Sequence, residues 1–208
     1  GSREPQRFAA PTLGAGDVPL LHLEHRPDAK PDDPRTAGLY HTAFLMPTRA
    51  DLARWILHVA RNRVPLTGAS DHAVSEAIYL DDPEGNGIEV YRDRPAEAWQ
   101  WASGDLKMTT DPLDIEDIVR EVPPGAAYPG APGGFRIGHV HLKVADLERS
   151  LAFYCGVLGF ALTQRYGREA AFISAGGYHH HIALNTWESQ GGSPPPPGTT
   201  GLYHLAIL

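Results

Sequence analysis

Alternation of apolar and polar residues predicts how the first half of the chain begins. Residues 39–46 alternate and are rich in β-forming side chains, which is typical of a strand. Thr48 can then act as a helix N-cap, with Asp51 as its capping-box partner three residues later. The helix is amphipathic, because apolar residues recur at i, i+3, i+4 and i+7. These residues are Leu52, Trp55, Ile56 and Val59.

Two further strands are expected after this helix, over residues 73–80 and 88–92. The segment 81–87 joins them and contains Asn86-Gly87, a pair that supplies the positive φ values of a tight hairpin. The first half therefore has the order strand, helix, strands.

The second half repeats this order. Residues 137–144 predict a strand, and Asp146 can cap a helix that Gly156 and Gly159 end. The apolar stripe of that helix consists of Leu147, Leu151, Tyr154 and Leu158. Three strands are expected next, over residues 160–166, 170–174 and 179–185.

A Pro- and Gly-rich linker, residues 123–134, divides the two halves and follows a short helix expected within 108–122. We therefore expect an N-terminal domain, a connecting segment and a C-terminal domain, over residues 1–106, 107–136 and 137–208. A module of one strand, one helix and three strands, used repeatedly, predicts an α+β protein with curved mixed sheets.

An internal repeat supports this organisation. Residues 38–45 (GLYHTAFL) return as residues 201–208 (GLYHLAIL), with six of eight positions identical. The second copy predicts another strand, with His204 in its middle. The first unit lacks the opening strand and the second lacks everything after Leu208, so we expect a chain truncated at both ends.

Composition narrows the class of protein. The net charge of −7, with both signs interspersed, provides no basic surface for nucleic acid. No apolar run of 18 residues exists, which excludes a membrane-spanning helix. The single cysteine, Cys155, rules out an internal disulfide and favours a reducing, cytoplasmic location.

The strand 137–144 carries the first candidate chemistry. Its alternation places His139, His141 and Lys143 on one face. A solvated sheet face would explain this pattern equally well. Histidines at 41 and 204 recur in the middle of repeated strands, either as core histidines or as ligands. Glu89 lies among β-forming residues, where an acid must face solvent or be paired. Two histidines and one carboxylate with open positions suit non-haem Fe(II) or a similar ion.

Two segments resemble the vicinal oxygen chelate superfamily, which includes glyoxalases, bleomycin resistance proteins and dioxygenases. Residues 137–160 (IGHVHLKVADLERSLAFYCGVLGF) resemble its opening module, and residues 75–95 resemble its closing hairpin. The 178–187 segment (YHHHIALNTW) and the 107–114 segment (KMTTDPLD) are similar to the type I extradiol dioxygenases, in particular the catechol 2,3-dioxygenase-like branch.

The resemblance implies particular site residues. His139 and His204 match the two metal-ligating histidines, with the third ligand, a glutamate, expected beyond Leu208. His180 matches the acid–base histidine. In the N-terminal unit four residues match a second metal ligand, a second-sphere histidine, a substrate-facing tyrosine and a carboxylate ligand: His41, His72, Tyr79 and Glu89. Because Leu20 stands where His180 stands in the other unit, we expect the N-terminal unit not to turn over substrate.

The activity that the resemblance implies is extradiol (meta) cleavage of a catechol-type aromatic diol with O2 at a mononuclear non-haem metal, Fe(II) or alternatively Mn(II). Fold does not decide chemistry. A glyoxalase-like isomerase, lyase or transferase and a non-catalytic ligand-binding protein therefore stay open as alternatives. The sheet edges that truncation would expose favour association into a homo-oligomer.

The missing glutamate predicts that this chain by itself binds iron poorly. A second outcome is also open, in which the modules at 38–95 and 137–186 pair with each other. His139, His41 and Glu89 would then form a hybrid metal site.

Overall fold

The computed structural model of the chain describes residues 11–207. Its elements in chain order are β1 (Thr12–Ala15), β2 (Val18–His22), β3 (Gly38–Leu45), α1 (Arg49–Arg61), β4 (Gly68–Asp71), β5 (Ser75–Asp81), β6 (Gly87–Asp93), a 3-10 helix η1 (Ala96–Ala98), β7 (Trp101–Ala102), β8 (Asp105–Leu106), α2 (Ile115–Val119), β9 (Arg136–Lys143), α3 (Leu147–Tyr154), β10 (Ala161–Tyr166), β11 (Ala170–Ser174) and β12 (Ile182–Asn185). Within the described range, no helix is both long and apolar enough to cross a membrane. The outer ends of the two predicted domains, residues 1–10 and 208, lie outside the described residues.

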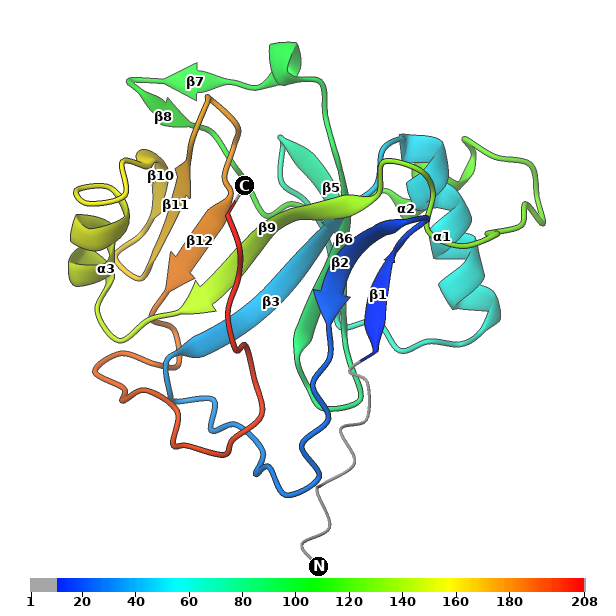
Figure 1. Ribbon diagram of the computed structural model, residues 1–208. Coiled ribbons are helices and arrows are strands. Elements are labelled where there is room, and N and C mark those ends of the chain that lie inside the picture. The colour runs from blue at the N-terminus through cyan, green and yellow to red at the C-terminus, as the bar shows by residue number, and fades with distance from the viewer. Residues whose placement is uncertain (1–10, 208) are drawn as a thin grey trace, which may run out of the picture.

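Two copies of the predicted module meet in one curved sheet of eight strands (Figure 1). Each copy has the order strand, helix, three strands, the first from β3 to β6 and the second from β9 to β12. The order across the sheet is β10-β11-β12-β9-β3-β6-β5-β4. In each module the first and last strands pair in parallel, and the two first strands, β3 and β9, pair antiparallel at the centre. The α+β class and the repeated βαβββ module are confirmed.

The linker at residues 123–134 separates these modules along the chain, whereas β3 and β9 join them in space. Both halves thus share one sheet, and their division into two domains stays a prediction.

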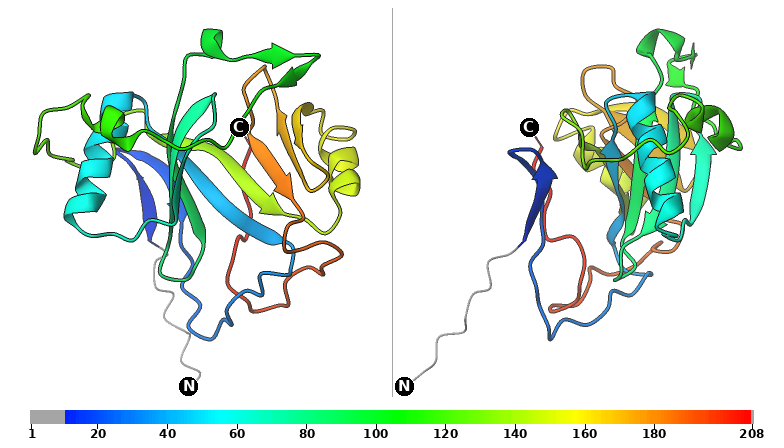
Figure 2. Two further views of the ribbon diagram at one scale, coloured as in Figure 1. Left: turned by 180° about the vertical axis from the view of Figure 1, so that it is seen from behind. Right: turned by 90° about the vertical axis from the view of Figure 1, so that its right-hand side faces the viewer.

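The two longer helices begin as their sequence patterns predict. The Thr48 hydroxyl accepts a hydrogen bond from the Asp51 amide at the start of α1, and the Asp146 carboxylate does the same for the Arg149 amide at the start of α3. The buried face of α1 packs on β5 and β6, and that of α3 packs on β11 and β12. Figure 2 shows the two helices at opposite ends of the sheet. Trp55, predicted for the buried stripe of α1, is only partly buried. Leu158, predicted for the apolar stripe of the second helix, lies beyond the end of α3 and is exposed.

The turn before β6 differs from its prediction. Gly85 carries the positive φ (84°), whereas Gly87 already belongs to β6 and pairs with His41. The reason is local, because the Asp82 carboxylate accepts hydrogen bonds from the amides of Glu84 and Asn86 and closes a wider turn. The short strands β4, β7 and β8 carry no alternation that predicted them.

The predicted C-terminal strand is wrong for the described residues. Residues 202–207 contain no regular secondary structure, although their sequence repeats β3. A strand needs a neighbour to satisfy its backbone groups. β3 has such neighbours in β6 and β9, while no described strand pairs with 201–207. The predicted strand at 179–185 forms only from Ile182 onward.

The segment after β6, residues 94–111, bridges the two edges of the sheet (Figure 1). Asp111 pairs with Asp71 of edge strand β4, and the Met108 carbonyl accepts a hydrogen bond from Gln164 of edge strand β10. Leu106 and Met108 are buried against Val74 and Phe172. The segment therefore links the two edge strands, β4 and β10.

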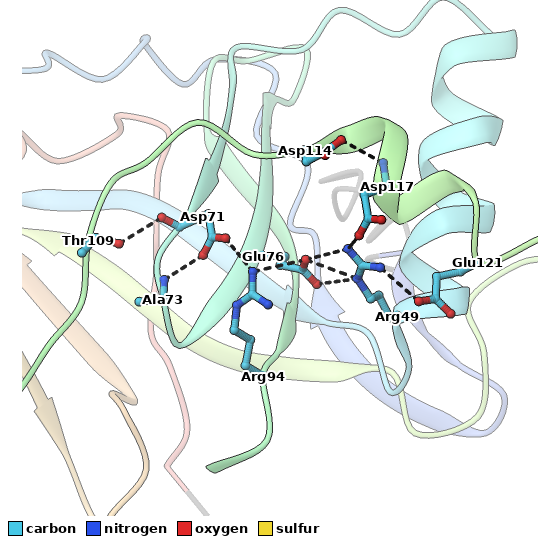
Figure 3. Close-up of polar contacts among 9 residues, drawn as sticks. All are labelled: Arg49, Asp71, Ala73, Glu76, Arg94, Thr109, Asp114, Asp117 and Glu121. Carbon is cyan, nitrogen blue, oxygen red and sulfur yellow. Dashed lines mark hydrogen bonds and ion pairs between the residues drawn. The ribbon is translucent and has the colours of Figure 1, made fainter. Parts of the chain in front are cut away.

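A buried carboxylate links α1 and α2 to this sheet. Glu76 of β5 is only 2% exposed and lies between the guanidinium groups of Arg49 and Arg94 (Figure 3). Arg49, at the start of α1, also reaches Asp117 of α2 and Glu121 just after it. One arginine thus joins the sheet, α1 and the connecting segment.

Candidate metal site

Three neighbouring strands place His139, Ala43 and Glu89 in one row across the sheet. Ala43 of β3 pairs with His139 of β9 on one side and with Glu89 of β6 on the other. Side chains that are opposite one another in a sheet project from the same face. Because the alanine between them is small and fully buried, His139 and Glu89 meet above it, with Nε2 lying 3.1 Å from Oε2.

His41 completes the cluster from β3, two residues before Ala43 and therefore on the same face. Its Nε2 lies 3.1 Å from the same Glu89 Oε2, yet this buried atom makes no well-aligned hydrogen bond. Ligand atoms of His41, Glu89 and His139 all lie within 4.8 Å of one another. The residues are 7%, 2% and 4% exposed, respectively.

The spacing of these donors fits a divalent metal ion. Nitrogen and oxygen ligands lie about 2.1 Å from such an ion, so two ligands at right angles are about 3.0 Å apart. Both histidine nitrogens are 3.1 Å from the carboxylate oxygen. Two histidines and one carboxylate on one face are the set that suits Fe(II), with positions left open. The three residues present therefore fit a metal such as Fe(II) or Mn(II).

The protonation states also favour a metal, which needs neutral imidazoles and an ionised carboxylate. Burial lowers the pKa of His139, and this effect outweighs the attraction of Glu89, which raises it. The resulting pKa is about 4. Burial alone would raise the pKa of Glu89, but the close approach of the His139 and His41 imidazoles outweighs it and holds that pKa well below its usual value.

Tyr79 and His72 support the cluster from β5 and the turn before it. Tyr79 pairs with Glu89 across the two strands. His72 Nδ1 lies 2.6 Å from the Thr109 carbonyl, so it must donate there, and its Nε2 then accepts the Tyr79 hydroxyl at 2.7 Å. Burial and the negative charge of Glu89 raise the pKa of Tyr79 well above its usual value, which keeps the phenol neutral.

Further histidines surround the cluster on the side of the second module. The ring of His180 lies 4.0 Å from that of His139, centroid to centroid, and the ring of His141 lies 4.9 Å from that of His41. His141 is held by Asn185, with 2.9 Å between Nε2 and Nδ2. Burial, followed by neighbouring imidazoles, lowers the pKa of His180 and of His141 well below the usual value, so both are neutral at pH 7.

The expected partner of His139 is elsewhere. His204 is exposed on the irregular C-terminal segment, with its ring against Tyr203, and does not join His139 within the described residues. Without a ladder to hold residues 201–207, nothing directs His204 toward the sheet. The structure instead brings together the three residues of the alternative hybrid site, His41, Glu89 and His139. The predicted acid–base residue, His180, lies next to them.

Sequence reasoning missed Tyr91, Asp93 and the role of His179 next to this cluster. A signal for the first two existed, because residues 89, 91 and 93 alternate along β6 and must share a face. His179 had no such signal, since it lies in the loop before β12.

A family model and several known proteins match this chain. The family model described as "Glyoxalase/Bleomycin resistance protein/Dioxygenase superfamily" matches residues 4–90 and 136–208. A protein of Bacillus subtilis named catechol-2,3-dioxygenase is 44% identical over 91% of this chain and 67% of its own length. Biphenyl-2,3-diol 1,2-dioxygenase 3 of Rhodococcus globerulus is 34% identical over 38% of this chain and 43% of its own.

A crystal structure assigned to a Bacillus subtilis dioxygenase aligns with a TM-score of 0.46 at 18% identity, over 79% of this chain and 44% of that one. The chain thus spans from under half to two thirds of the length of these three proteins. With the family model matching both modules, the chain belongs to the Glyoxalase/Bleomycin resistance protein/Dioxygenase superfamily.

Proposed function

We propose that this chain carries a site for extradiol ring cleavage of a catechol-type aromatic diol by O2, at one Fe(II) or Mn(II) ion held by His41, Glu89 and His139. The observation that carries the proposal is the convergence of these three buried donors from three strands. When bound, the metal supplies the open coordination positions and the redox chemistry that ring cleavage needs. The expected product is a ring-opened semialdehyde or a related acid.

The names of the relatives support the reaction class. The Bacillus subtilis protein is named catechol-2,3-dioxygenase and the Rhodococcus globerulus protein biphenyl-2,3-diol 1,2-dioxygenase. Both names describe oxygenation of an aromatic ring with two neighbouring hydroxyl groups. A diol of this kind is therefore the proposed substrate of the present chain.

The remaining residues have roles that follow from their positions. His180 is neutral and packs on the ligand His139, so it can accept a proton from a diol hydroxyl and return it later. Tyr79 stays protonated and donates its hydrogen to His72, so its oxygen can accept a hydrogen bond from a substrate hydroxyl next to Glu89. The bridging segment at residues 94–111 limits the entry of water from one side.

Anaerobic loading with Fe(II), followed by catechol and then air, tests the reaction. A yellow ring-opened product supports the proposal, whereas metal binding without product points to a glyoxalase-like enzyme. Catechol binding in the absence of metal points to a binding protein.

Two matched variants test the ligand set. His41→Ala should abolish metal binding and product formation, and His204→Ala should leave both intact. The opposite result would refute the ligand set proposed here and support the pair His139 and His204.

A further inference from the structure

A chain of hydrogen bonds leads from the surface to the acid–base candidate. Asp93 Oδ1 lies 2.8 Å from Nε2 of His179, and Nδ1 of His179 lies 2.7 Å from Nδ1 of His180. The Asp93 side chain is 23% exposed, while that of His179 is fully buried. None of these contacts involves the three proposed metal ligands.

The two modules contribute different parts of this chain. Asp93 ends β6 of the first module, and His179 and His180 precede β12 of the second. The Tyr178 hydroxyl also donates to Asp93, at 2.9 Å, so the carboxylate is held from two sides. Thr163 donates to the His179 carbonyl at 2.7 Å, which fixes the backbone of the loop.

The contacts determine where the protons lie. An ionised carboxylate only accepts, so Nε2 of His179 must carry the hydrogen that points at Asp93. When His179 is neutral, its Nδ1 then has a lone pair and can only accept. Nδ1 of His180 must therefore carry the hydrogen of the 2.7 Å contact, which leaves Nε2 of His180 without one.

We propose that Asp93 is a positioning residue which, through His179, fixes the tautomer of His180 with its proton on Nδ1 and a free lone pair on Nε2. Within residues 11–207, the hydrogen bond that His180 makes with its side chain is the one at Nδ1, which leaves Nε2 without a partner. A substrate hydroxyl above the ligand His139 would then meet an acceptor. The opposite tautomer would present an N–H group and could not take the proton.

The inference rests on the proposed function only where it assigns proton transfer to His180. The tautomer itself can be measured without metal or substrate. Long-range ¹H–¹⁵N correlation spectra of histidine-labelled, metal-free protein at pH 8 distinguish the two tautomers. We expect His179 with its proton on Nε2 and His180 with its proton on Nδ1.

Asp93→Leu removes the acceptor and should give mixed tautomers at both histidines. Tyr178→Phe removes the other hydrogen bond to Asp93 and should leave both tautomers as in the wild type. A wild-type His180 protonated on Nε2 would overturn the proposal, and so would unchanged tautomers in Asp93→Leu. If Asp93→Leu does not fold, the wild-type spectrum alone decides.

Metal binding separates this inference from the proposed function. Asp93 is no ligand, so a folded Asp93→Leu protein should keep the thermal stabilisation by Mn(II) that the wild type shows. Loss of that stabilisation in Asp93→Leu would mean that Asp93 acts on the metal cluster itself, and would overturn its role as a positioning residue for His180 alone.

Discussion

Replacement of Glu89 by glutamine tests the metal cluster most directly. The amide keeps the size of the carboxylate but removes the one negative charge of the cluster, whose Oε2 lies 3.1 Å from a nitrogen of each histidine. A divalent ion is then held by two neutral imidazoles and a neutral amide oxygen. The metal affinity should therefore fall steeply, while the fold, formed by the strands around it, should persist.

The effect can be expressed as a melting temperature. Metal at about 100 times its Kd stabilises the native state by about 2.7 kcal/mol. For a chain of this length that raises the melting temperature by about 5–10 °C. If Glu89→Gln weakens binding about 100-fold, the same metal concentration equals Kd and contributes about 0.4 kcal/mol, or about 1–2 °C.

Thermal unfolding with and without Mn(II) measures both values. Glu76→Gln is a matched control, because Glu76 is equally buried, at 2% exposure, but pairs with Arg49 and Arg94 on the opposite face of the sheet. It should lower the melting temperature of the metal-free protein and keep the full metal-induced rise. A full rise in Glu89→Gln, or its loss in the control, would contradict the ligand assignment.

Three further predictions concern stability without metal. The pKa of His139 falls from 6.5 to about 4 on folding, so the unfolded chain binds the proton first as the pH falls. Through that window the free energy of unfolding should drop by about 3 kcal/mol from this residue. Urea unfolding at pH 7.5 and pH 4.5 measures this drop, and equal free energies at the two pH values would refute it. Glu76→Ala should cost about 3 kcal/mol, because it leaves two guanidinium groups near the sheet without their buried partner. Asp117→Asn, at the exposed end of the same network, should cost less than about 1 kcal/mol. Equal losses of stability in urea unfolding would contradict the difference in burial. Gly138→Ala would place a Cβ into the Tyr91 hydroxyl and should cost about 1–3 kcal/mol as that buried ring shifts. An unchanged urea midpoint would show that the ring moves freely.

The local elements follow from local sequence. Thr48 and Asp146 are side chains that satisfy the first amides of a helix, so they mark helix starts whatever surrounds them. The alternation in β3 and β9 likewise assigns each side chain to a face before any partner is known. The turn at Gly85 and the irregular residues 202–207 were mispredicted, because an aspartate side chain and the lack of a pairing strand decided them.

The chain by itself determined the module, its repetition and the face on which His41, Glu89 and His139 project, since these depend on periodicity within single elements. Which module pairs with which was decided only in the tertiary structure, because β-ladders join segments that are distant in sequence. The antiparallel pairing of β3 with β9 sets His139 opposite Ala43, and the parallel pairing of β3 with β6 sets Glu89 on its other side. A metal cluster made of three strands is therefore a property of sheet register.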